Sequence, residues 1–176
     1  EDRFDLYAKI GCRILRDHDG GVRGVDWSAV EWERGKFDFS HLDRQMALYA
    51  KYNITLFPVM GDSFVEKTKY WQNLRWPLWA VPLSERVKDD PPNCAPGARG
   101  HILLPPKDLF RDYIYQTVKH LKGRVPVYEI TNEPNLYLSQ EAYVTYLKEA
   151  NAAIRKADPA AKIAGFCLTS DYGRVA

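Results

Sequence analysis

Residues 125–135 read Val-Pro-Val-Tyr-Glu-Ile-Thr-Asn-Glu-Pro-Asn, an apolar run that ends in a polar Asn-Glu-Pro segment. β-Branched and aromatic residues dominate the run, which predicts a buried strand over 125–131. Pro134 cannot donate a backbone hydrogen bond, so the strand should stop just before it. Glu133 is therefore expected at the C-terminal end of a strand.

Predicted helices and strands alternate along the chain, which is typical of a parallel sheet covered by helices. Further strands are predicted at 12–17, 54–60 and 162–168, and helices at 4–10, 40–50, 106–122 and 139–156. Ser40 is predicted to cap the second helix, with Asp43 three residues on as in a capping box. Four such strands are half of an eight-stranded (β/α)8 TIM barrel, which usually needs about 250 residues.

The interval between the second and third predicted strands is too long for one helix and two short loops. Its surplus lies in 61–104, which we interpret as an elaborated loop after a barrel strand. Such loops line the catalytic face of a barrel. Trp71, Trp76 and Trp79 fall in this loop, and their rings suit stacking on the C–H faces of sugars. The alternative is that they only pack the loop onto the barrel.

Composition excludes several classes of protein. The 176 residues are 45% hydrophobic, enough for a globular core, and the formal charge of +2 has no basic stripe that would favour nucleic acid. The sequence contains no run of about 18 apolar residues, so no membrane-spanning helix is predicted. The cysteines follow no metal-binding spacing, and Cys12 and Cys167 are predicted to fill the core.

The segment around Glu133 resembles the acid/base strand of retaining glycoside hydrolases of clan A, especially family 39, the β-xylosidase and α-iduronidase type. In that family a Tyr/Trp-Glu-aliphatic-x-Asn-Glu-Pro-Asn segment carries the proton-donating glutamate. The resemblance implies that Glu133 is the general acid/base and that Asn132 binds the sugar. Weaker similarities begin at Arg16-x-His18, where His18 would bind a sugar hydroxyl, and continue through Trp27, Val30, Glu31, Gly35, Phe37, Asp38, Phe39, Leu42 and Asp43.

The resemblance further implies that 1–176 is a fragment of one catalytic domain, with about strands two to five of the barrel and their helices. The family's nucleophile is a glutamate at the end of the seventh strand, which would lie beyond Ala176. An oligosaccharide or polysaccharide substrate is expected, with no cofactor, no metal and no nucleic-acid or membrane partner. The missing barrel half would be needed for a closed fold. We therefore expect the chain alone to be inactive.

Glu129 shares a strand face with Glu133, but four residues of strand separate the two by about 13 Å. Retaining glycosidases hold their two carboxyl groups only about 5–5.5 Å apart, so Glu129 is not expected to be the nucleophile. We predict instead that it lies deeper in the barrel with a cationic or hydrogen-bonding partner. A non-catalytic carbohydrate-binding barrel derivative is the main alternative function. A metal-dependent hydrolase built on Asp17-His18-Asp19 lacks a second histidine at ligand spacing.

Overall fold

The computed structural model of the chain describes residues 3–17, 24–61, 64–66, 77, 79–80, 85–86, 101–136 and 138–168. Its main sheet has the strand order β1-β2-β6-β7, with bounds Ile14–Asp17 (β1), Thr55–Met60 (β2), Val127–Ile130 (β6) and Lys162–Ala164 (β7). The helices are Arg3–Lys9 (α1), Trp27–Val30 (α2), Ser40–Lys51 (α3), Lys107–Leu121 (α4) and Gln140–Ala157 (α5), with a 3-10 turn at Pro134–Leu136.

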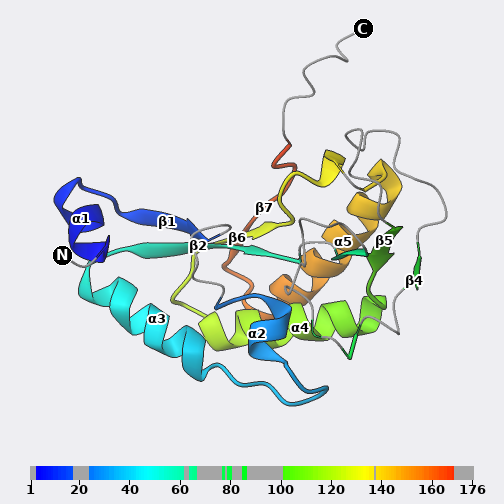
Figure 1. Ribbon diagram of the computed structural model, residues 1–176, viewed down its shortest axis with the longest axis horizontal. Helices are drawn as coiled ribbons and strands as arrows, with labels where there is room; N and C mark the ends of the chain where they lie inside the picture. The colour runs from blue at the N-terminus through cyan, green and yellow to red at the C-terminus, as the bar shows by residue number, and fades with distance from the viewer. Residues whose placement is uncertain are drawn as a thin grey trace, which may run out of the picture.

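All neighbouring strands of the main sheet pair in parallel, and each new strand is added on the same side. Right-handed connections then place the helices on one face of the sheet. In Figure 1, α3 and α4 run along the same side of the sheet, and α5 packs against α4. A sheet wound in one direction with helices on one face is the arrangement of part of an α/β barrel. The predicted α/β class is confirmed.

The core lies between the sheet and the helices. The apolar face of α4 buries several side chains fully, among them Ile114, Val118 and Leu121, in one cluster with Ile154 of α5 and Ile130 of β6. Leu121 is followed closely by Gly123, whose φ of 75° suits a chain reversal that glycine adopts without strain. Local sequence patterns and packing therefore agree along α4.

The segment 61–104 contributes a second, smaller sheet. Strands Phe64–Glu66 (β3), Glu85–Arg86 (β4) and His101–Leu104 (β5) pair antiparallel in the order β3-β5-β4. β3 begins soon after β2 ends, and β5 leads directly into α4 (Figure 1). The long interval between β2 and β6 thus contains strands of its own.

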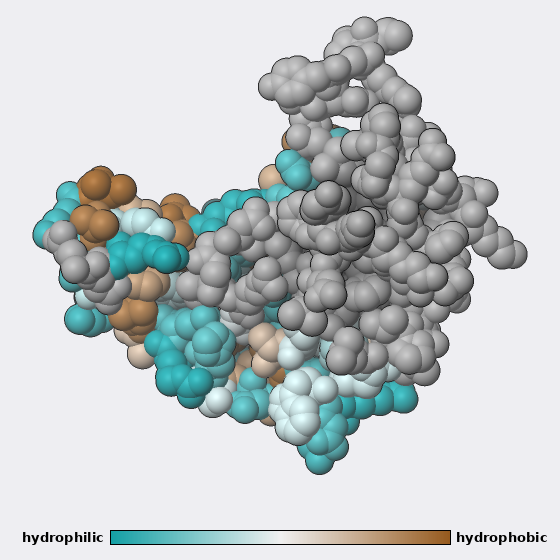
Figure 2. All heavy atoms as spheres, viewed as in Figure 1, coloured by the Kyte–Doolittle hydropathy of each residue, from teal (hydrophilic) through white to brown (hydrophobic). Residues whose placement is uncertain are grey.

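The outer strands β1 and β7 each pair with one neighbour among the described residues. Large apolar side chains are exposed beside both, namely Leu6, Ile10, Ile14, Phe166 and Leu168. Figure 2 shows hydrophobic side chains gathered at the end of the molecule that carries α1. Exposed apolar groups beside open sheet edges are typical of surfaces that contact further structure.

Several local predictions were wrong. Ser40 is not the cap of α3: it is the first helical residue, and its N–H donates to Asp38 Oδ1 at 2.8 Å. This hydrogen bond holds the pKa of Asp38 below its ordinary value. Two strands end earlier than predicted: β6 ends at Ile130, not at Thr131, and β7 ends at Ala164, not at residue 168. Cys12 and Cys167 are partly exposed and do not fill the core, since each lies beyond the end of a strand.

None of the described helices combines the length and the apolar character that crossing a membrane requires.

Candidate active site

Asn132 and Glu133 lie directly after β6, at the C-terminal end of the parallel sheet. The turn that carries them is hydrogen-bonded to the end of β2 on one side and to the segment that follows β7 on the other. The Thr131 N–H donates to Met60 O at 2.9 Å and its Oγ1 donates to Gly61 O at 3.0 Å, both at the end of β2. On the other side, the Glu133 N–H donates to Cys167 O at 2.9 Å. The position of Glu133 is thus fixed by backbone contacts on two sides.

The backbone of this turn is unusual. Thr131 has φ = 66° and Glu133 has φ = 46°, in the left-handed region that non-glycine residues avoid. A β-branched residue such as Thr131 is a particular outlier there, and such a conformation costs about 1–3 kcal/mol. Strain of this kind persists only where surrounding contacts enforce it, and it is concentrated at functional sites. The turn therefore marks a candidate site independently of any resemblance.

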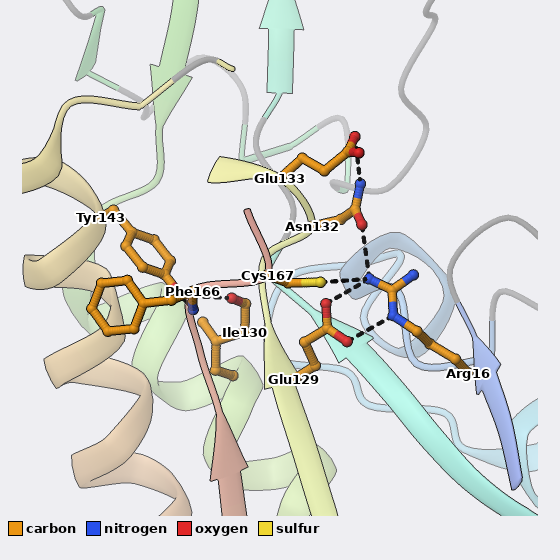
Figure 3. Close-up of polar contacts among 8 residues, drawn as sticks. All are labelled: Arg16, Glu129, Ile130, Asn132, Glu133, Tyr143, Phe166 and Cys167. Atoms are coloured by element: carbon orange, nitrogen blue, oxygen red, sulfur yellow. Dashed lines mark hydrogen bonds and ion pairs between the residues drawn. The ribbon is translucent and has the colours of Figure 1, made fainter. Parts of the chain in front are cut away.

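Four side chains form a continuous hydrogen-bonded row at this end of the sheet (Figure 3). Arg16 Nε donates to Glu129 Oε2 at 2.7 Å, and its Nη2 donates to Glu129 Oε1 at 2.5 Å. The same Nη2 donates to Asn132 Oδ1 at 2.7 Å. Asn132 Nδ2 in turn donates to Glu133 Oε2 at 3.2 Å. The row joins the buried carboxylate of β6 to the carboxylate at the rim.

Glu129 and Arg16 form an ion pair in which the Glu129 side chain is 3% exposed and the Arg16 side chain 34%. The hydrogen bond to Glu129 raises the pKa of Arg16, so the guanidinium is charged. Glu129 also raises the pKa of the neighbouring Cys167 thiol. The prediction that Glu129 lies in the interior with a cationic partner is confirmed, and both of its oxygens are engaged.

Of the aromatic residues predicted to bind sugar, Trp79 lies within the described part of the chain. Its Nε1 donates to Glu31 O at 3.1 Å, and its ring meets Trp27 edge-on with centroids 5.6 Å apart. These contacts account for its position by packing, and its stacking on a sugar stays a prediction. His18, Trp71 and Trp76 lie outside the described residues.

The sequence did not reveal that Arg16 is the partner of Glu129. A signal was present, since Arg16 is a cationic residue inside the strand Ile14–Asp17. The strand pairing also places both residues on one face: Arg16 is paired with Phe57, and Val59, two residues on, is paired with Glu129. The left-handed conformation of Thr131 has no signal in the sequence. Among the described residues no three His, Cys, Asp or Glu side chains gather as a metal site.

No family model matches the chain, and no curated protein does either. Solved structures do. The chain is similar to xylanase 10B from Thermotoga petrophila RKU-1 in complex with xylobiose, with a TM-score of 0.54 and 17% identity over 90% of this chain and 43% of that one. It is also similar to a family 39 glycoside hydrolase from Bacteroides cellulosilyticus WH2, with a TM-score of 0.56 and 17% identity over 93% and 28%.

A third similar structure is an exo-β-1,4-mannosidase from Opitutaceae bacterium strain TAV5, with a TM-score of 0.57 and 19% identity over 91% of this chain and 26% of that one. These structural neighbours are glycoside hydrolases with TIM-barrel folds. At such identities the similarity shows the fold alone, and family 39 is one of several families represented. The chain spans less than half the length of each of the three.

Proposed function

We propose that this chain forms part of the catalytic barrel of a retaining glycoside hydrolase in which Glu133 is the general acid/base. The observation that carries the proposal is the position of the Glu133 carboxylate. It projects from a strained turn at the C-terminal end of a parallel strand, and backbone hydrogen bonds fix this turn on two sides. The carboxylate accepts a hydrogen bond from Asn132. Barrel enzymes place their chemistry at this end. The glycosidase folds of the structural neighbours support the same assignment.

Glu133 in its acid form would protonate the glycosidic oxygen, and its carboxylate would later activate water. Asn132 would contact the sugar beside the reacting carbon, with an oligosaccharide or polysaccharide as the substrate. By resemblance its partner there is the 2-hydroxyl group. His18 and the tryptophans Trp71, Trp76 and Trp79 remain candidates for further sugar contacts.

A retaining mechanism also needs a carboxylate nucleophile about 5–5.5 Å from the acid/base. Glu129 is unsuited to this role, because Arg16 binds both of its oxygens. We propose that the nucleophile belongs to a later barrel strand, as in family 39. Among the described residues β1 and β7 each pair on one side only, and together with their exposed apolar neighbours this fits a main sheet whose strands are about the second to the fifth of a barrel.

The assignment can be tested by measuring the hydrolysis of aryl glycosides by the longest natural polypeptide that contains this chain. We expect turnover that falls by about 10²–10⁴-fold in Glu133→Gln, because that is the usual contribution of a general acid/base. The control is Glu141→Gln, which removes an exposed carboxylate of α5 and should leave activity unchanged. ¹H NMR of the first product shows whether the anomeric configuration is retained.

The 176-residue chain is assayed beside it and should be inactive. Turnover by this chain that disappears in Glu133→Gln would show that it contains its own nucleophile, and would contradict this part of the proposal. Sugar binding by the natural polypeptide with no Glu133-dependent turnover would favour the non-catalytic, carbohydrate-binding alternative.

A further inference from the structure

The orientation of the Asn132 amide is decided by Arg16. A guanidinium group only donates hydrogen bonds, so the Asn132 atom that faces Arg16 Nη2 at 2.7 Å must be Oδ1. Nδ2 then necessarily faces Glu133. Glu129 holds the guanidinium in place through two hydrogen bonds from a nearly buried position (Figure 3). The ion pair therefore sets a side chain that touches the rim carboxylate.

This orientation matters most when Glu133 carries a proton. Because Asn132 Nδ2 donates to Oε2, that oxygen acts as an acceptor and the proton of the acid form belongs on Oε1. If the amide turned over, Oδ1 would face Glu133 and could accept the proton in a hydrogen bond. That hydrogen bond would hold the proton on Glu133 and would compete with its transfer to the substrate. In the folded protein, turning the amide would direct its NH2 group at the guanidinium, which has no acceptor.

We infer that Arg16 is a positioning residue that keeps the acid proton of Glu133 available to the substrate by preventing the Asn132 amide from turning over. The inference rests on the proposed function. In the step concerned, the proton moves from Oε1 to the glycosidic oxygen while the bond from that oxygen to the anomeric carbon breaks. The O–H electron pair stays on Glu133, and the carboxylate nucleophile of the completed barrel bonds to the carbon.

The test compares leaving groups in the longest natural polypeptide. Dinitrophenyl glycosides need little protonation of the leaving oxygen, whereas phenyl glycosides need it. In Arg16→Gln we expect kcat/KM for the phenyl substrate to fall at least tenfold more than kcat/KM for the dinitrophenyl substrate. Because the ratio is taken on one preparation, it does not depend on the fraction of folded protein. A purely structural role would lower both values equally, and that result would overturn the inference.

Two further variants sharpen the test. Arg16→Lys keeps a cation that only donates, so it should restore the ratio of the natural protein to within about threefold, an expectation based on the donor chemistry of lysine. In an Asn132→Ala background no amide oxygen is present to accept the proton. There Arg16→Gln should change the ratio no further, as a thermodynamic cycle between coupled groups requires. An undiminished effect of Arg16→Gln in this background would overturn the inference.

A measurement independent of activity separates this inference from the proposed function. The side-chain NH2 resonances of Asn132, assigned by their loss in Asn132→Ala, should shift when Glu133 is replaced by Gln. In Arg16→Gln that response should vanish, because the NH2 group no longer faces Glu133. An unchanged response would overturn the role of Arg16 even in an active enzyme. Absence of Glu133-dependent turnover, with the NMR response as expected, would overturn the proposed function and leave the orientation by Arg16 supported.

Discussion

The two faces of strand β6 are built on opposite principles. Tyr128 and Ile130 belong to the apolar core formed with α4 and α5. Glu129, between them, faces the other way and meets Arg16 in a polar interior. One face stabilises the fold by removing apolar surface from water. The other holds charge and strained backbone, which cost stability and are retained where a protein positions reactive groups.

The largest loss of stability is expected on the apolar face. Ile114 of α4 is fully buried, so Ile114→Ala should lower the free energy of unfolding by about 2–5 kcal/mol, through lost burial and the cavity left behind. Ile10→Ala is the matched control, because Ile10 is 79% exposed. It should change stability by less than about 0.5 kcal/mol. Urea denaturation measures both, and equal effects would contradict the placement of the core.

The end of β2, which supports the strained turn, provides the next prediction. Gly61 has φ = 77°, and a Cβ there would lie 2.8 Å from the buried ring of Phe110. Gly61→Ala should therefore cost about 2–4 kcal/mol, combining backbone strain with overpacking. Gly123→Ala isolates the strain, because φ is 75° and, apart from its chain neighbours, no atom of the described residues lies within 4 Å of the added Cβ. It should cost only about 1 kcal/mol, and a similar loss in both variants would exclude the clash with Phe110.

On the polar face, Glu129→Gln should cost about 1–3 kcal/mol, because Arg16 loses its charged partner but remains partly hydrated. Glu33→Gln is the control: it removes a surface carboxylate that pairs with Lys36 at 2.6 Å. Exposed pairs of this kind contribute about 0–1 kcal/mol. A loss from Glu129→Gln no larger than that of Glu33→Gln would show that leaving Arg16 without its carboxylate costs no more than leaving a surface lysine unpaired.

The contrast between the faces also explains what the sequence could predict. Periodic apolar patterns and helix caps depend on residues that lie close together in the sequence. The bounds of α4 and of the helix that begins after Ser139 were therefore predicted closely. Ser139 Oγ accepts from Ala142 N at 3.2 Å, as an N-cap does. Glu129 was predicted inside the barrel because strand alternation puts it on the face of Glu133 and four residues of strand place it about 13 Å deeper. Its partner Arg16 lies 113 positions away, so identifying it required the strand order and register.

Elsewhere local signals competed. Ser40 and Asp38 are both good N-cap residues, but the N-cap position falls on Phe39 between them, and the Asp38 side chain accepts from the Ser40 N–H. The strand ends were the other failure. Thr131 has strong β-propensity, but its hydrogen bonds to Met60 O and Gly61 O hold it in the left-handed region. At the candidate site, tertiary contacts thus override the local preference that the sequence expresses.

The smallest expected effect at pH 7 has the opposite sign and lies on the apolar face. The Tyr128 hydroxyl is buried without a hydrogen-bond partner among the described residues, and burial raises its pKa. Tyr128→Phe should therefore raise the free energy of unfolding by up to about 1 kcal/mol at pH 7, because an unsatisfied polar group is removed.

The gain should grow at high pH. A tyrosine whose pKa is higher in the folded than in the unfolded state contributes stability below the unfolded value of about 10, and that stability is lost as pH rises beyond it. Phenylalanine has no such loss. The difference between Tyr128→Phe and the natural chain should therefore widen by about 1 kcal/mol between pH 10 and pH 11, where the unfolded tyrosine passes from half to almost fully ionised. Urea titrations across this range measure it. A constant difference would show that Tyr128 ionises as readily in the folded as in the unfolded chain. Water would then reach its hydroxyl on this face of β6.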